Sequence, residues 1–204
     1  MPIYKSKYFP ESKLAHELLG GLKGLEIGGS AHNAFGLDTL NVDYTNAMDT
    51  IFKKSEIEFC GVAMPVDLIA DGDRIPVPDK SFHYIISSHV IEHFFDPIKA
   101  IKEWERIAKR YIYIICPQPD ADPVDRGKPI TELSELIDRY IGKIVAPELH
   151  DHRHWTRFTC STFREMCAAF DWPVSHWQDP DDKVGNGFTI VIDLYRRSGR
   201  GWPN

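Results

Sequence analysis

The stretch that decides the fold lies near the start of the chain and reads Gly24-Leu25-Glu26-Ile27-Gly28-Gly29-Ser30. Leu25 and Ile27 are the apolar residues of a short buried strand, with the acidic Glu26 between them. Two glycines then let the backbone turn sharply and approach a ligand closely. A strand that ends in an acid and a glycine turn is typical of a nucleotide site in an open α/β sheet. An ordinary tight turn explains the stretch alone equally well.

Strand and helix patterns alternate over the ninety residues that follow. We expect strands at 22–27, 39–44, 66–70, 82–88 and 111–116, and helices at 46–59 and 97–109. Asp96 and Pro97 form a capped start for the second helix. The segment 31–36 is too short for a full crossover helix. Alternation of this kind predicts a doubly wound, mostly parallel sheet that is buried on both faces.

The two ends of the chain complete the predicted architecture. An amphipathic helix at 4–20 precedes the first strand, and helices at 131–140 and 161–170 follow the fifth, the last with Ser161 as its N-cap. Residues 188–195 read as a strong late strand that forms an antiparallel hairpin with a strand near 173–178. We therefore expect one α/β domain over residues 1–204.

Composition excludes several classes of protein. The 204 residues carry a formal net charge of −6, which argues against general nucleic-acid binding because phosphate neutralisation needs a basic surface. No apolar run approaches the roughly 20 residues that span a bilayer, and the start lacks the apolar core of a signal peptide. The four cysteines have no CxxC spacing and read as reduced thiols. We expect a cytoplasmic protein without membrane or nucleic-acid partners.

Polar residues gather where the predicted strands end. In a parallel sheet the carboxyl ends share one edge, where ligands bind. The residues expected at that edge are Glu26, Gly28, Asp43, Asp71 and Ser88. Each alone has an ordinary structural explanation, but their convergence favours a ligand site.

These residues resemble a known family. Leu25-Glu26-Ile27-Gly28-Gly29, Val42-Asp43, the run from Ala70 to Phe82 and Val90-Ile91-Glu92-His93 are similar to the class I S-adenosylmethionine-dependent methyltransferases. The similarity covers about residues 22–117 and is closest to the group that methylates small molecules. It implies a Rossmann-like methyltransferase fold with a seven-stranded sheet, an antiparallel last strand and S-adenosylmethionine as cofactor.

The resemblance assigns roles to single residues. It implies that Glu26 orients the amino end of the methionine portion, and that Gly28 and Gly29 allow close backbone access. It implies that Asp43 holds the ribose hydroxyls. Ser30 stands where the family has a second glycine, and we expect its hydroxyl to bond the cofactor's carboxylate.

The remaining implied roles lie along the next two strands. Asp71 would bond the adenine amino group, and the backbone N–H of Gly72 would assist it. Ser88 would lie under the methionine portion, and His89 would face the transfer site, so that both belong to the expected cofactor-binding residues. His32 stands in place of the third glycine of the family and His83 in place of an aspartate.

Histidines supply candidate bases for the transfer, since a hydroxyl or amine acceptor can require one. We name His89, His93 and His152 as catalytic candidates, and packing or capping is the alternative for each. His93 lies four residues after His89 and shares its face if that turn is helical.

The segment 150–157 is the second region of interest. Alternate histidines on an extended chain point the same way, so His150, His152 and His154 line an acceptor pocket, bind a metal or form a polar surface loop. In the pocket interpretation Arg153 or Arg157 grips an acidic substrate. We expect no metal site, a solvated loop at Asp120, Asp122 and Asp125, and a core position for Cys116.

We therefore expect methyl transfer to an oxygen or nitrogen of a small molecule. Residues 1–20 would be a cap helix, 22–117 the cofactor-binding half and 118–204 the acceptor side. The alternatives are a nicotinamide-dependent (NAD) oxidoreductase on a dinucleotide-binding fold, and a non-catalytic domain that keeps the fold. The acceptor and the oligomeric state are not encoded in any motif.

Overall fold

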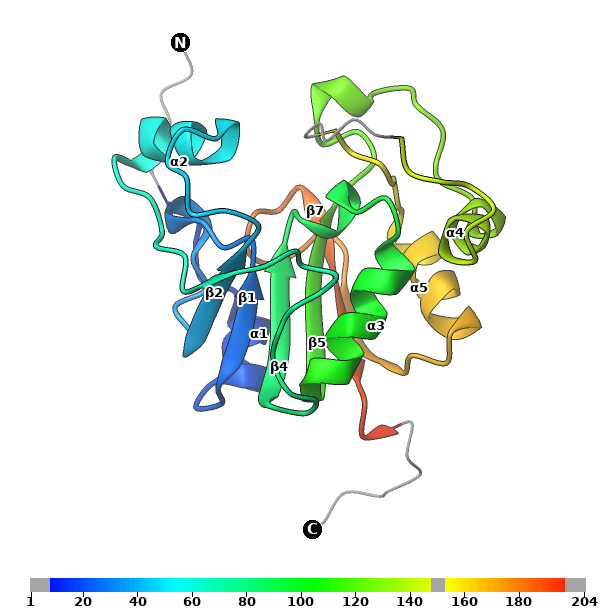
Figure 1. The fold of residues 1–204 in the computed structure, drawn as a ribbon, viewed down its shortest axis with the longest axis horizontal. Helices are drawn as coiled ribbons and strands as arrows, with labels where there is room; N and C mark the ends of the chain where they lie inside the picture. The colour runs from blue at the N-terminus through cyan, green and yellow to red at the C-terminus, as the bar shows by residue number, and fades with distance from the viewer. Residues whose placement is uncertain (1–7, 148–152, 197–204) are drawn as a thin grey trace.

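A seven-stranded sheet forms the centre of the computed structural model, which describes residues 8–147 and 153–196. Its strand order is β3-β2-β1-β4-β5-β7-β6 (Figure 1). The strands are β1 (Gly24–Ile27), β2 (Thr39–Asp43), β3 (Leu68–Ile69), β4 (Phe82–Ser88), β5 (Ala108–Pro117), β6 (Val174–Gln178) and β7 (Gly187–Asp193).

Six of the seven strands run in one direction, and β7, between β5 and β6, runs in the opposite direction. The pairs from β3 to β5 are parallel, whereas β7 pairs antiparallel with both β5 and β6. The predicted fold class is thereby confirmed: a mostly parallel seven-stranded sheet with an antiparallel hairpin strand. Because β1 lies between β2 and β4, the carboxyl ends of β3, β2, β1 and β4 follow one another along one edge.

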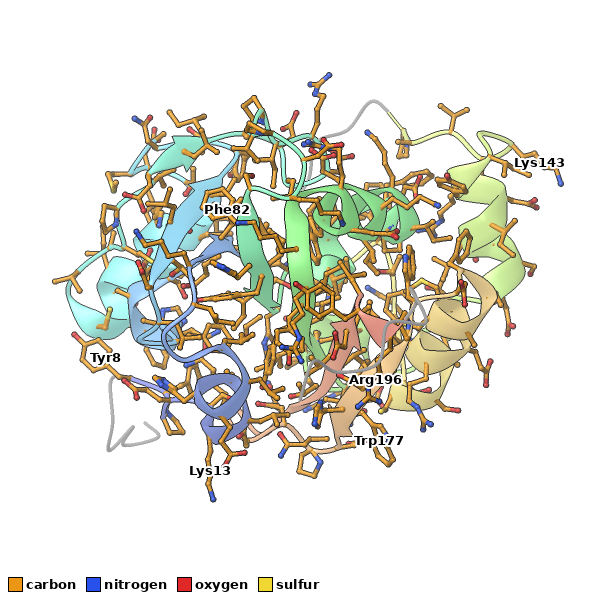
Figure 2. The ribbon with its side chains drawn as sticks, turned by 90° about the horizontal axis from the view of Figure 1, so that it is seen from below. Tyr8, Lys13, Phe82, Lys143, Trp177 and Arg196 are labelled. Atoms are coloured by element: carbon orange, nitrogen blue, oxygen red, sulfur yellow. The ribbon has the colours of Figure 1, made fainter. Side chains whose placement is uncertain are left out.

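Two hydrophobic layers cover the two faces of the sheet. Alternate residues of β5 point to opposite faces: Ile112 and Ile114 join the larger core, while Tyr111 and Tyr113 join the smaller one. Helices α3 (Pro97–Ile107), α4 (Leu133–Tyr140) and α5 (Cys160–Ala169) pack on the larger core. On the other face α1 (Lys13–Leu19) is packed (Figure 2).

The N-terminal helix is shorter than the sequence predicts. Ser12 caps α1 by accepting from Ala15 N, so residues 8–12 precede the helix, and residues 4–7 lie outside the described part. The Ser12 hydroxyl donates to Asp182 Oδ1 at 2.6 Å, and Lys183 Nζ donates to Pro10 O at 3.1 Å. These bonds, rather than further helix, attach the start of the chain to the loop between β6 and β7.

Two other boundaries also differ from expectation. Thr159, not Ser161, caps α5, because Thr159 and Thr162 form a reciprocal capping box. The strand β5 begins directly after α3, with Ala108 as the C-cap of the helix and the first residue of the strand. The Asp96 cap and Pro97 start of α3 are confirmed, since Asp96 accepts from Lys99 N at 2.9 Å.

The first crossover contains only the three-residue 3-10 turn η1 (Ala31–Asn33), as the short segment 31–36 predicts. Helix α2 (Ile51–Cys60) follows β2 and lies beyond the upper ends of β1 and β2 (Figure 1). Two further short turns, η2 (Ile91–His93) and η3 (Pro123–Asp125), follow β4 and β5. Within residues 8–147 and 153–196, no helix has the length and apolar character that crossing a membrane requires.

Candidate cofactor and acceptor site

The glycine turn after β1 is fixed by the protein itself. Gly28 has φ +64°, a conformation that side chains rarely adopt, and its N–H donates to Val42 O at 2.8 Å. Gly29 N donates to Asn41 Oδ1 at 2.9 Å. A Cβ on Gly28 would lie 2.9 Å from Val90 Cγ2. Packing within the protein therefore explains the need for glycine here without any contribution from a ligand.

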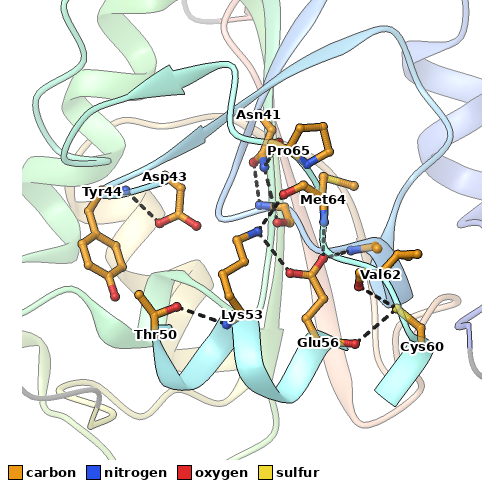
Figure 3. A network of polar contacts seen from close by, with 12 residues as sticks. Asn41, Asp43, Tyr44, Thr50, Lys53, Glu56, Cys60, Val62, Met64 and Pro65 are labelled. Carbon is orange, nitrogen blue, oxygen red and sulfur yellow. Dashed lines mark hydrogen bonds and ion pairs between the residues drawn. The ribbon is translucent and has the colours of Figure 1, made fainter. Parts of the chain in front are cut away.

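Helix α2 clamps the same turn through a buried ion pair (Figure 3). Lys53 Nζ lies 3.1 Å from Glu56 Oε2 and donates to Met64 O at 3.0 Å. Glu56 Oε1 accepts from Met64 N at 2.7 Å and from Ala31 N. Both charged side chains are at least 97 % buried. The short first crossover is thus held in place by α2 instead of by a helix of its own.

The three predicted acids lie on neighbouring strands. Glu26 is 5 % exposed within β1, and burial raises its pKa to about 7 although Thr39 donates to it at 3.2 Å. Asp43 ends β2 and is half-buried, which raises its pKa, while its Oδ1 accepts from Tyr44 N. Asp71 follows β3 and pairs with Arg74 at 3.2 Å. Asp43 and Asp71 therefore reach the carboxyl edge side by side.

A cleft of about 530 Å³ opens beside Asp71. Its wall combines Ile69, Ala70 and Pro76 with charged residues of α3. Gly72 lies close by, with its carbonyl accepting from Trp104 Nε1 at 2.7 Å. At the β3 end of the carboxyl edge, the cleft thus combines apolar side chains with the carboxylate of Asp71.

Ser88 and His89 end β4 and are linked to each other. Asn33 Nδ2 donates to Ser88 Oγ at 3.1 Å, and Ser88 Oγ lies 3.1 Å from His89 Nδ1. His89 Nε2 lies 2.9 Å from Asn186 Oδ1. Burial lowers the pKa of His89, which favours its neutral form. His89 also has φ +56°, a strained value for a residue other than glycine.

His93 does not share a helical face with His89, contrary to that hypothesis. The helical turn η2 covers only residues 91–93, and His89 lies before it in the left-handed region. His93 instead contacts the segment after residue 152. Its Nδ1 lies 3.2 Å from Arg153 O, and its ring meets the ring of His154 edge-on at 4.7 Å. His150 and His152 lie outside the described residues.

One expectation for the loops after β5 is wrong. Asp125 is 4 % exposed and bonds His154 Nδ1 and Lys128 Nζ, so it does not belong to a solvated loop. Arg157 is 7 % exposed and donates to Pro119 O at 2.6 Å, so its guanidinium links two loops, and its contact with an acidic substrate stays one of the alternatives. Cys116 is a core residue, as expected, and burial raises the pKa of its thiol.

Sequence reasoning missed four residues that shape this edge, namely Asn41, Lys53, Glu56 and Glu92. An i,i+3 pair of opposite charges on a short helix normally lies in solvent, so Lys53 and Glu56 gave no distinct signal. Glu92 did have a sequence signal, because it precedes His93 in the segment that follows the predicted strand at 82–88.

The comparisons with known proteins agree with this geometry. Residues 21–116 match the model of a family described as a methyltransferase domain. This segment belongs to that methyltransferase-domain family. The predicted family is thereby confirmed, and the cofactor of the domain is S-adenosylmethionine. No curated protein sequence matches the chain.

Solved structures with the same fold come from distant relatives. A SAM-dependent methyltransferase from Methanosarcina mazei is 15% identical with a TM-score of 0.53, covering 89% of this chain and 96% of its own. A protein from Pyrococcus horikoshii is 16% identical with a TM-score of 0.52, covering 88% and 85%. A SAM-dependent methyltransferase from Thermotoga maritima is 13% identical with a TM-score of 0.50, covering 88% and 84%. At these identities the likeness establishes the fold.

The residues present fit an adenosyl group. Asp43 and Asp71 offer carboxylates at adjacent strand ends, and the cleft beside Asp71 is lined by both apolar and charged residues. The backbone at Gly29 is less accessible to a ligand than the sequence predicts. A Cβ there would lie 2.8 Å from Met64 Sδ and 2.9 Å from Asn41 Oδ1, so the protein already fills that side.

Proposed function

We propose that this protein transfers a methyl group from S-adenosylmethionine to an oxygen or nitrogen of a small molecule. The observation that carries the proposal is the order of polar groups along one sheet edge. Asp71, Asp43 and the Gly28 turn follow β3, β2 and β1, and His89 follows the next strand. That order is the one in which the adenine, the ribose, the methionine portion and the acceptor would follow one another.

In this proposal, successive strand ends along the edge bind successive parts of the cofactor. Asp71 and Gly72 receive the adenine, Asp43 accepts from the ribose hydroxyls, and Glu26, Ser30 and Ser88 lie toward the methionine end. The cofactor supplies an activated methyl group with its leaving group. Residues 22–117 thus hold the cofactor. Residues 118–204 and the cap, residues 1–20, form the walls of the acceptor pocket.

The protein's contribution is chiefly alignment, which supplies about 7–11 kcal/mol when two reactants are held in line. His89 is our candidate base. Its lowered pKa keeps the ring neutral near pH 7, so a ring nitrogen can take a proton from the acceptor. Doing so requires release of the contact to Ser88 or to Asn186. His93 and His152 remain the other candidates from the sequence.

The short first crossover argues against the oxidoreductase alternative. A dinucleotide site places its pyrophosphate on the N-terminus of a helix after the first strand. Here η1 has three residues and Glu56 already occupies the N–H of Ala31. We therefore propose no nicotinamide cofactor for this chain.

Calorimetry with S-adenosylmethionine and its demethylated product tests the proposal. Losing the charged hydrogen bonds of Asp43 is worth about 1.5–3 kcal/mol, so Asp43→Asn should weaken binding roughly 10- to 150-fold. Asp38→Asn is the matched control, because Asp38 is exposed at the opposite end of the same strand. No binding at millimolar cofactor would contradict the proposal.

A turnover assay separates an enzyme from a binding domain. A panel of hydroxyl and amine acceptors is scored by release of demethylated cofactor. His89→Gln should lower kcat about 10²- to 10⁴-fold, the usual contribution of a general base, with cofactor affinity retained. Tight cofactor binding without turnover on any acceptor would favour the non-catalytic alternative.

A further inference from the structure

A cluster of three metal-binding side chains lies beside the carboxyl edge. Glu92 and His93 belong to η2, and His154 belongs to the segment after residue 152. One ligand atom of each lies within 4.8 Å of those of the other two. The backbone holds the two segments together, because Trp155 N and Thr156 N both donate to Glu92 O, at 2.8 and 3.1 Å.

The two histidines are oriented as metal ligands usually are. His93 Nδ1 faces the carbonyl of Arg153 at 3.2 Å, and a carbonyl only accepts, so Nδ1 carries the hydrogen. His154 Nδ1 bonds the carboxylate of Asp125. In both rings the hydrogen at Nδ1 leaves Nε2 with the lone pair. Metal-bound histidines are fixed in this way by an outer carbonyl or carboxylate.

Glu92 provides an independent indication of a ligand. Its side chain is 2 % exposed, and among the described residues Oε2 has no hydrogen-bond partner. Its other oxygen, Oε1, lies 4.0 Å from His93 Nε2. Burying a polar atom without a partner is costly, and a bound cation beside the two imidazoles would supply that partner.

We propose that Glu92, His93 and His154 bind one divalent transition-metal ion of the zinc class, with Asp125 as the outer carboxylate of His154. Two imidazoles and one carboxylate form a set that zinc and iron(II) accept, whereas Mg²⁺ prefers oxygen ligands. Bond lengths of about 2.0–2.1 Å place tetrahedral ligand atoms roughly 3.3 Å apart. The ligand atoms, now within 4.8 Å of one another, would therefore move together by at most about 1.5 Å on binding.

This site differs from the one that the histidine spacing suggested. The sequence pointed to His150, His152 and His154 on one extended strand, as one of three alternatives, and our expectation was no metal. The new site uses only His154 of that set and takes its other two ligands from η2, which follows β4. It does not rest on methyl transfer, so either proposal can fail without the other.

Metal titration of the full-length, tag-free protein after chelator treatment is the test. We expect one Zn²⁺ per chain by calorimetry against a competing chelator, and Co²⁺ absorption bands of nitrogen and oxygen coordination. Glu92→Gln, His93→Gln and His154→Gln should each weaken Zn²⁺ binding at least about 100-fold, and Asp125→Asn about 10- to 100-fold. His176→Gln on β6 is the matched control and should bind as the parent does.

Three results would overturn the proposal. The first is a parent protein that binds neither Zn²⁺ nor Co²⁺ at micromolar concentration. The second is unchanged affinity in folded Glu92→Gln or His93→Gln protein. The third is a loss in His150→Gln or His152→Gln that Glu92→Gln does not share. If a ligand variant fails to fold, the Co²⁺ spectrum of the parent decides, and a spectrum without imidazole coordination contradicts the site.

Discussion

Replacing Glu56 with glutamine should destabilise the protein strongly while conserving side-chain volume. One Glu56 oxygen accepts two backbone N–H groups and the other faces Lys53 Nζ at 3.1 Å. A glutamine must turn its NH₂ toward either the ammonium or the backbone donors, where it cannot accept. Breaking a buried ion pair by removing one partner costs about 3–5 kcal/mol. For a chain of this size that lowers Tm by about 6–20 °C.

Urea unfolding followed by circular dichroism measures the loss, and amide exchange at Ala31 and Met64 shows whether the turn opens. Glu58→Gln is the matched control, because Glu58 is exposed on the same helix, and should stay within about 0.5 kcal/mol of the parent. Adding Lys53→Met to Glu56→Gln removes the unpaired ammonium, so the double variant should lose less than the sum of the singles. A Glu56→Gln loss no larger than that of Glu58→Gln would refute the reasoning.

Three further predictions follow from the same region. Gly28→Ala should cost more than Gly61→Ala in urea unfolding, because both have positive φ but only Gly28 has a neighbour, Val90 Cγ2 at 2.9 Å from the new Cβ; equal costs would contradict the contact. Burial raises the pKa of Glu26 to about 7, so the native state holds its proton more tightly and stability without cofactor should fall as pH rises from about 4.5 to 7. The free energy of unfolding should fall by about 3 kcal/mol over this pH range because of Glu26, and Glu26→Gln should remove that part of the fall. An unchanged pH dependence of stability in Glu26→Gln would show that Glu26 ionises freely. Asp182→Asn leaves one acceptor oxygen for two donors, the Ser12 hydroxyl and Leu14 N, and should lower stability by about 1–3 kcal/mol; a melt of equal Tm would disprove this.

The fold was largely predictable because its strands carry their signals locally. The runs at β4 and β7 are apolar enough to identify buried strands, and the Asp96-Pro97 start of α3 is a purely local cap. The start of the chain was less predictable. The residues before α1 are held by Asp182 and Lys183, and no local pattern reports a partner some 170 positions away.

The site was predictable in its position more than in its contacts. The strand ends place Asp43, Asp71 and Ser88 along one edge, as alternation requires. The sequence could not show that Asp125 is buried, because its partner His154 lies 29 residues further on in a segment without regular structure. Nor could it show that α2 turns its charged pair inward, since the buried partners of Lys53 and Glu56 are backbone atoms.

The attachment of Ser12 to Asp182 has a consequence for biosynthesis. The earliest described residues leave the ribosome first, yet their acceptor is made about 170 residues later, a delay of roughly 10–30 s at common elongation rates. During that interval α1 cannot dock through this bond, although Tyr84, Tyr111 and Tyr113 of the layer that shields Ala15 and Leu19 have already been made. The N-terminal attachment is therefore completed only after the loop between β6 and β7 has been translated.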